Sequence, residues 1–200
     1  MISTILLAAG QSLRMNGENK LLKQINGIPL IKCTVKNILA SAVDELIIVL
    51  GHEDNLLKNT IGINKKTKFI YNKDFKKGMS SSIKVGLNEI SKKSQGFFIS
   101  LGDMPNINQN IYNKLIKSMS SYNKKLKPIH KKEIIIPTFE GREGNPVLFS
   151  KFMKNKIMNL EGDIGAKKII EQNRAKVLNV PFDNKGIIID FDTQDHFNAS

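Results

Sequence analysis

Short runs of consecutive apolar, largely β-branched residues recur along the chain, and segments with a helical spacing of apolar residues separate them. Within several runs the apolar positions are adjacent rather than alternating, which is typical of strands covered on both faces. Seven runs have this character, at residues 3–8, 45–51, 67–72, 96–103, 133–137, 175–180 and 186–191. We therefore expect seven strands, most of them buried.

Helical patterns lie between these runs. Residues 29–42 carry an apolar stripe at spacings of three and four, and Pro29 suits a first helical turn. The segments 80–93 and 109–122 show the same period less strongly, and 165–173 predicts a short fourth helix. Strands and helices alternating at this spacing predict an α/β fold, with a doubly wound, mostly parallel sheet and helices on both faces.

The length and composition indicate a single domain over residues 1–200. A chain of 200 residues, 40% of them hydrophobic, can form one well-developed core but hardly two. Residues 123–132 contain five Lys and a Pro, which indicates an exposed, mobile connection. The residues that follow it are too few for an independent second core, and we find no internal repeat.

The net charge of +13, from 31 Lys and Arg against 18 Asp and Glu, favours anionic partners. Nucleic acid, acidic membranes and phosphorylated small molecules all qualify. The excess is mostly scattered Lys, for which a solvated basic surface is the simplest interpretation. A nucleic-acid site interleaves basic with aromatic residues, but aromatics make up only 6% of this chain and the 123–132 cluster has none. A nucleic-acid-binding protein is therefore the disfavoured alternative.

The expected location is the cytoplasm. Cys33 stands alone, which excludes an intrachain disulfide and a thiolate metal cluster and favours a reducing compartment. The first ten residues lack the basic region of a signal peptide, and Ser3 and Thr4 interrupt their apolar run. No stretch approaches the ~20 apolar residues of a membrane span, so we expect no membrane partner.

The loop that follows the first apolar run is a candidate phosphate-binding site. The run ends at Ala8, and in an open α/β sheet ligands bind beyond the carboxyl ends of the strands. In the loop "AGQSLRMNGENK", residues 9–20, small residues allow backbone N–H groups to approach phosphate oxygens, while Arg14 and Lys20 supply charge. Neither the dinucleotide fingerprint nor the P-loop spacing is present. Taken alone, the loop is equally consistent with a plain turn.

Two further runs end in carboxylates at the same expected edge. Residues 96–103 end in Asp103, and residues 186–191 lead into Asp190 and Asp192, which alternation places on one face. One or two carboxylates, completed by water and phosphate oxygens, suit a nucleotide-bound Mg²⁺. Asp103 also suits a turn, because a Pro follows two residues later. Together, the three strand ends predict a metal–triphosphate site.

Six segments resemble the molybdenum cofactor nucleotidyltransferases. "LAAGQSLRMNGENKLL" at 7–22 resembles that family's L-A-A-G-x-S-x-R-M-G-x-x-K-L-L signature. In the family's order there follow "GMSSSI" at 78–83, "LGDMP" at 101–105, "GREGNPVLF" at 141–149, "GDIGAK" at 162–167 and "DFDT" at 190–193. The resemblance covers nearly the whole chain. It implies a Rossmann-like nucleotidyltransferase that uses Mg²⁺ to join an NMP moiety to the terminal phosphate of a molybdopterin-type acceptor, with release of pyrophosphate.

The resemblance also implies a role for each matched position. Arg14, Lys20 and Asp103 would be catalytic, with the two cations on the triphosphate, and Mg²⁺ would be held by Asp103 and Asp192. The residues implied in nucleotide binding are Leu7, Ala8, Ala9, Gly10, Ser12, Arg14, Lys20, Gly78, Ser80, Ser81 and Asp103. The residues implied in acceptor binding are Gly144, Asn145, Pro146 and Asp163.

Three departures from the family pattern bear on these expectations. Asn16 stands where the signature has Gly, Asn145 replaces a common His, and Gln194 replaces a frequent Pro. The absence of that His removes an argument for acid–base chemistry, which an already anionic phosphomonoester does not require.

The choice of nucleotide base also follows from the resemblance. Ala9 and the "GMSSSI" segment resemble the cytidylyl branch, whereas "AGG" is usual in the guanylyl branch, so CTP is the favoured donor. Guanylyl transfer, or transfer to a different phosphorylated acceptor, is the alternative. A molybdoenzyme or its chaperone is a further partner that the resemblance implies.

Overall fold

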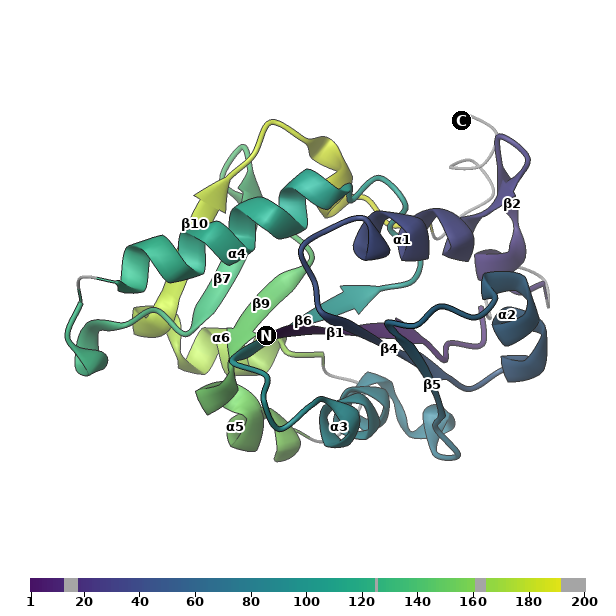
Figure 1. Ribbon diagram of the computed structural model, residues 1–200, viewed down its shortest axis with the longest axis horizontal. Coiled ribbons are helices and arrows are strands. Elements are labelled where there is room, and N and C mark those ends of the chain that lie inside the picture. The colour runs from purple at the N-terminus through teal and green to yellow at the C-terminus, as the bar shows by residue number, and fades with distance from the viewer. Residues whose placement is uncertain (13–17, 125, 161–164, 192–200) are drawn as a thin grey trace.

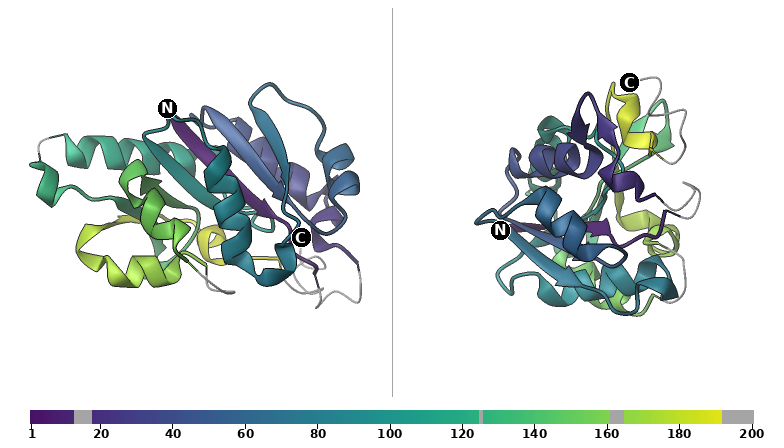
Figure 2. Two further views of the ribbon diagram at one scale, coloured as in Figure 1. Left: turned by 90° about the horizontal axis from the view of Figure 1, so that it is seen from below. Right: turned by 90° about the vertical axis from the view of Figure 1, so that its right-hand side faces the viewer.

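A twisted sheet runs through the centre of the protein, with helices packed on both of its faces (Figures 1 and 2). The computed structural model describes residues 1–12, 18–124, 126–160 and 165–191. In these residues the order of strands across the sheet is β10-β7-β9-β6-β1-β4-β5. The eighth strand, β8, pairs with β7. The strands of this sheet are β1 (Ile2–Ala8), β4 (Glu45–Leu50), β5 (Thr67–Tyr71), β6 (Gly96–Leu101), β7 (Ile134–Phe139), β8 (Arg142–Glu143), β9 (Val147–Ser150) and β10 (Val177–Pro181).

The predicted parallel arrangement is confirmed. Strand β1 pairs in parallel with both β4 and β6, β4 pairs in parallel with β5, and β10 pairs in parallel with β7. Strand β9 is antiparallel to both β6 and β7 and joins the two parallel parts. Because β1 is parallel to both of its neighbours, β4 and β6, the carboxyl ends of the three strands lie at one edge of the sheet. A separate hairpin consists of β2 (Gln24–Ile25) and β3 (Ile28–Pro29).

Two apolar clusters, one on each face of the sheet, form the core. One cluster includes residues of α1 (Leu30–Leu39), α2 (Asp54–Ile61) and α4 (Gln109–Asn123). The other includes residues of α3 (Met79–Glu89), α5 (Lys154–Met158) and α6 (Lys167–Gln172). Figure 1 shows α1 and α4 on one side of β1 and β6, and α3 and α5 on the other. This is the doubly wound α/β arrangement expected from the alternation of patterns.

The four predicted helices are present as α1, α3, α4 and α6, and α1 begins directly after Pro29. Six of the seven apolar runs contain strands. The strand predicted over 186–191 is wrong, because Lys185–Ile188 forms a 3₁₀ helix. The side chain of Asn184 caps this turn by accepting a 2.8 Å hydrogen bond from the N–H of Gly186. Ile187 is fully buried there, so the apolar run reflects burial without strand pairing.

Besides 3₁₀ helices, the pattern does not predict six elements of the described residues: α2, α5, β2, β3, β8 and β9. Helices α2 and α5 are short, and β9 has only four residues.

In the Lys-rich connection 123–132, of which residue 125 is not described, the side-chain amide of Asn123 makes two 2.8 Å hydrogen bonds with the backbone of Lys132. Among the described residues, no helix has the length and apolar character needed to cross a membrane.

The contact between α3 and β1 requires a glycine at position 86. A Cβ atom on Gly86 would lie 2.4 Å from Cγ2 of Ile5 and 3.1 Å from Cγ2 of Val49. Overpacking of this kind costs about 1–3 kcal/mol, and improved helix propensity returns up to about 1 kcal/mol. We therefore expect Gly86→Ala to lower the free energy of unfolding by about 1–2 kcal/mol, measured by urea denaturation.

Asn88→Ala is the matched control, because Asn88 is exposed on the same helix and makes no such contact. This variant should be as stable as the parent or slightly more stable. A Gly86→Ala protein with unchanged or increased stability would show that α3 and β1 can separate at no cost.

Candidate active site

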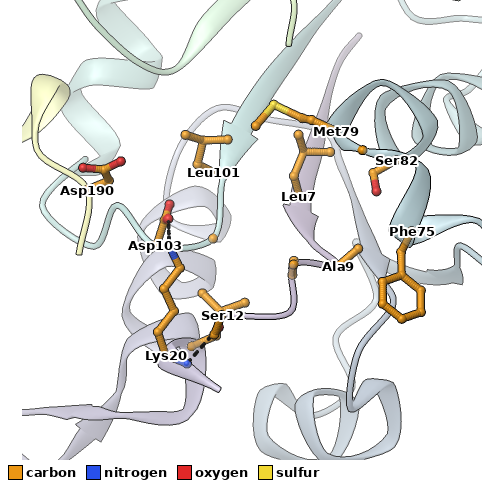
Figure 3. Close-up of a pocket in the computed structure, with 15 residues that line it drawn as sticks. Leu7, Ala9, Ser12, Lys20, Phe75, Met79, Ser82, Leu101, Asp103 and Asp190 are labelled. Atoms are coloured by element: carbon orange, nitrogen blue, oxygen red, sulfur yellow. Dashed lines mark hydrogen bonds and ion pairs between the residues drawn. The ribbon is translucent and has the colours of Figure 1, made fainter. Parts of the chain in front are cut away.

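A cavity of about 330 Å³ opens at the carboxyl ends of β1 and β6 (Figure 3). The loop after β1, the first residues of α3 and the segment after β6 form its walls, and Asp190 lies at one side. Eight residues that the sequence assigned to nucleotide binding line it together: Leu7, Ala8, Ala9, Gly10, Ser12, Lys20, Gly78 and Asp103. Segments that are far apart in the sequence thus meet here, because the strands before them end at the same edge of the sheet.

Two glycines allow the neighbouring strands to close on the exit of β1. The N–H of Gly102 donates a 3.0 Å hydrogen bond to the carbonyl of Leu7, and a Cβ on Gly102 would lie 3.1 Å from that oxygen. On the other side, a Cβ on Gly51 would lie 2.8 Å from the carbonyl oxygen of Ala9. The loop is therefore held close between β4 and β6, with its small residues at the cavity wall.

The far end of the loop is anchored by side chains that hydrogen-bond to the backbone. Ser12 Oγ accepts a 3.1 Å hydrogen bond from the N–H of Lys20, eight residues away. Buried Asn19 accepts one of 3.1 Å from the N–H of Leu21, which starts the 3₁₀ helix Lys20–Leu22. These bonds fix the backbone of Lys20 beside the cavity.

Lys20 and Asp103, 83 residues apart in the sequence, meet in this cavity. Lys20 Nζ lies 2.5 Å from Asp103 Oδ2, and the two side chains are only 18% and 13% exposed. Figure 3 shows the pair spanning the cavity wall between the loop and the end of β6. The carbonyl of Asp103 also accepts a 3.0 Å hydrogen bond from the N–H of Phe191, which ties the chain after Lys185–Ile188 to this edge. The predicted cation and carboxylate are therefore direct neighbours.

The donor atoms at this edge suit a hard divalent cation. Asp103 and Asp190 both line the cavity and offer carboxylate oxygens, the donor type that Mg²⁺ prefers. Among the described residues, no group of three or more His, Cys, Asp and Glu could hold a metal ion. The residues present thus fit a cation whose coordination is completed by substrate oxygens and water, as is usual for Mg²⁺ with nucleotides.

The serines of the "GMSSSI" segment are arranged differently from the prediction. Gly78, with a φ of 99°, and Ser82 line the cavity, whereas Ser80 and Ser81 line a separate cavity of about 320 Å³. Ser81 Oγ lies 2.8 Å from the carbonyl oxygen of Gly78 and accepts a 2.9 Å hydrogen bond from Asn72. Ser82 lies three residues after Met79, so both share one face of α3 and both line the cavity of about 330 Å³.

A second cavity, of about 170 Å³, lies directly beside the first. Asp190 lines both cavities, and Met104 follows Asp103 into the second. Gly144 and Asn145, two of the residues assigned to acceptor binding, line it as well, whereas Pro146 is not among its lining residues. The Asn145–Pro146 peptide bond is cis.

Three predicted residues, Arg14, Asp163 and Asp192, lie outside the described residues, so their placement stays a prediction. Six residues that line the cavity are not among those expected from the sequence: Leu21, Phe75, Met79, Ser82, Leu101 and Gly102. Phe75 could have been expected, because it follows β5, which ends at Tyr71 on the same edge. Ligands of α/β sheets bind beyond the carboxyl ends of the strands. The sequence pattern places the carboxylate of Asp190 at this edge, although the family resemblance implies Asp192 as the metal ligand.

Comparison with known proteins places this geometry in context. A sequence model of the MobA-like NTP transferase domain matches residues 4–177. Purine catabolism protein PucB of Bacillus subtilis is 25% identical over 204 residues, which cover 97% of this chain and 93% of PucB. The bifunctional protein GlmU of Staphylococcus epidermidis is 26% identical over 118 residues, or 58% of this chain. That match spans about a quarter (26%) of GlmU.

Solved structures share the fold. Rv0371c from Mycobacterium tuberculosis H37Rv superposes with a TM-score of 0.84 over 99% of this chain and 95% of that one, at 23% identity. A crystal structure of Rv0371c in complex with manganese gives a TM-score of 0.80 over 99% of this chain and 96% of that one, at 22% identity. These similarities show that the chain shares its overall fold with these proteins.

Proposed function

The chain belongs to the family of MobA-like NTP transferase domains, and we propose that it transfers CMP from CTP to the terminal phosphate of a molybdopterin-type acceptor, releasing pyrophosphate. Membership of the family makes the protein a nucleotidyltransferase. The choice of CTP and of the acceptor is the proposed part, and it rests on the sequence segments 7–22, 78–83 and 141–149.

The observation that most directly supports the nucleotidyl-transfer part of this proposal is the Lys20–Asp103 pair within a cavity walled by a small-residue loop. A triphosphate requires cations and backbone donors, and its accompanying metal requires carboxylates. One cavity of about 330 Å³ is lined by Lys20, by the small residues after β1 and by the carboxylates of Asp103 and Asp190, which supports this proposal. A cavity built only to bind an apolar ligand would have no use for a nearly buried Lys and Asp.

The residues of the chain would act mainly by alignment and charge neutralisation. Small residues at the exit of β1 would let backbone N–H groups approach the phosphates, and Lys20 would neutralise charge on the leaving pyrophosphate. Asp103 and Asp190 would hold a divalent cation, which supplies further charge neutralisation when bound. The manganese complex of Rv0371c agrees with a divalent-cation site in this fold. No general base is required, because the phosphomonoester acceptor is already anionic.

Direct competition between nucleotides tests the proposal. With molybdopterin and Mg²⁺, we expect CMP transfer and pyrophosphate release, with kcat/KM for CTP at least about tenfold above that for GTP. Pyrophosphate release gives the rate, and mass spectrometry of the product identifies the base transferred.

A preference for GTP would assign the chain to guanylyl transfer instead. Absence of turnover with molybdopterin and all four nucleotides would overturn the acceptor assignment. In that case, screening phosphorylated acceptors with CTP would follow, since the family still predicts nucleotidyl transfer.

A further inference from the structure

The second cavity contains an arginine that none of the resemblance-based roles uses. Arg142, on the two-residue strand β8, is the one Lys or Arg among the described residues that line this cavity of about 170 Å³. Asp190 connects the cavity to the nucleotide site, because it lines both. A cation therefore lies in a cavity that shares a wall residue, Asp190, with the larger cavity.

The charges around Arg142 leave it available for a ligand. Its neighbour Glu143 is bound by Arg174, with Nη1 2.5 Å from Oε1, so the negative charge of Glu143 is already offset. Within the part of the chain that the structure describes, Arg142 itself makes no ion pair. Because its side chain is exposed, an arriving anion can reach it without displacing a bound carboxylate.

The backbone that carries Arg142 is held firmly. Strand β8 pairs with β7 through a tight turn at Glu140 and Gly141, both with positive φ, and Arg142 lies opposite Phe139. Past β8, the N–H of Gly144 donates a 2.9 Å hydrogen bond to the carbonyl of Pro137. A binding group on rigid elements loses less freedom when a ligand arrives.

The 3₁₀ helix Lys185–Ile188 fixes the other side of this segment. The N–H of Asn145 donates a 2.8 Å hydrogen bond to the carbonyl of Ile187. A Cβ on Gly144 would lie only 2.4 Å from that same oxygen, so the close approach requires glycine. The cavity walls are thereby held together from both sides.

We propose that Arg142 binds the phosphate group of the acceptor and holds it next to the nucleotide, an inference that rests on the proposed function. A guanidinium donates two parallel hydrogen bonds to phosphate oxygens, which orients the group as well as neutralising it. The cavity is about half the volume of the nucleotide cavity, so it suits an anionic head group with the rest of the acceptor outside. The substrate class is thus a phosphomonoester, and a dephosphorylated acceptor lacks the group that Arg142 recognises.

A kinetic experiment compares Arg142→Met and Arg142→Lys with the parent, using molybdopterin as acceptor. We expect Arg142→Met to raise KM for the acceptor by about 10- to 100-fold, as for the loss of a charge-assisted hydrogen-bonded pair. KM for CTP should stay the same, and Arg142→Lys should fall between the two proteins. Lys117→Met is the control for charge, since Lys117 is exposed on α4 and lines neither cavity. An unchanged acceptor KM in Arg142→Met would overturn the inference while leaving the proposed function intact.

A binding experiment gives the answer even if molybdopterin is not the acceptor. The chain has three Arg, so a nitrogen–proton NMR spectrum of the Nε–H groups is simple, and the signal missing in Arg142→Met identifies Arg142. Inorganic phosphate, titrated into the full chain with Mg²⁺ and a non-hydrolysable CTP analogue, should shift that signal saturably. A saturable shift in a protein inactive with molybdopterin would contradict the proposed acceptor and support the Arg142 site. A signal that stays unchanged would overturn the Arg142 site whatever the acceptor.

Discussion

Asp103→Asn should lower turnover by on the order of 10²-fold or more, the usual loss when one preorganised electrostatic contact is removed from an active site. The substitution keeps the shape of the side chain and removes its charge. The carboxylate lies 2.5 Å from Lys20 Nζ within the nucleotide cavity, so its loss affects the balance of charge around the triphosphate. Removing the charge also weakens the binding of a divalent cation, for which carboxylates are preferred donors.

Steady-state kinetics at saturating Mg²⁺ and the binding of Mn²⁺ followed by electron paramagnetic resonance provide the measurements. Glu89→Gln is a matched control, because Glu89 pairs with Lys68 on the surface and lines neither cavity. The control should turn over at the parent rate. Near-normal turnover of Asp103→Asn would remove Asp103 from the metal site and with it the main support for the proposed chemistry.

The sequence predicted the central strands well because their pattern has one main physical cause. Strands β1, β4 and β6 lie between other strands and under helices on both faces, so most of their residues are buried and apolar. The run at 186–191 has the same appearance for a different reason. Ile187 is fully buried against other elements, while its backbone forms a 3₁₀ turn capped by Asn184. Burial alone therefore could not distinguish the two structures.

Strand β9, by contrast, is a strand that has no recognisable pattern in the sequence. Its four residues are too few for a reliable pattern, and it exists because Val147–Ser150 finds partners in both β6 and β7. Its register places Gly96 opposite Ser150, which are 54 residues apart in the sequence. Pairing over such a separation depends on the assembled sheet and leaves no local signal in the sequence.

The positions of site residues that follow strands could be predicted from the sequence, because parallel strands end at one edge of the sheet. The positions of site residues on α3 could not, because they depend on where the helix begins. Lys20 and Asp103 meet because β1 and β6 are parallel neighbours that end at one edge. In "GMSSSI", by contrast, each step along the helix turns a side chain by about 100°. Whether Ser80, Ser81 or Ser82 reaches the cavity depends on where α3 begins, and the structure starts it at Met79.

Lys20→Met should weaken binding of the nucleotide. Loss of a charge-assisted hydrogen bond to the triphosphate should raise KM for the nucleotide by about 10- to 100-fold, corresponding to about 1.5–3 kcal/mol. The effect on turnover at saturating nucleotide should be smaller. Unchanged nucleotide kinetics would show that the loop from Ala9 to Lys20 does not hold the phosphates.

In the protein without ligand, Lys20 Nζ competes with any cation for Asp103, because it lies 2.5 Å from Oδ2. We therefore expect Lys20→Met to bind free Mn²⁺ up to about tenfold more tightly than the parent, consistent with the loss of a competing ion pair worth on the order of 1 kcal/mol. In the parent, a triphosphate that attracts Lys20 would free the carboxylate for the metal. By linkage, metal and nucleotide then increase each other's affinity by the same factor.

Mn²⁺ titrations with and without a non-hydrolysable nucleotide analogue, followed by electron paramagnetic resonance, measure this coupling directly. Lys68→Met, which breaks the surface pair with Glu89, should leave both the affinity and the coupling unchanged. A Lys20→Met protein with weaker Mn²⁺ binding in the absence of nucleotide would mean that Lys20 supports the carboxylate as a metal ligand instead of competing for it. Stronger binding combined with reduced coupling would identify the ion pair as the contact that makes metal binding depend on the nucleotide.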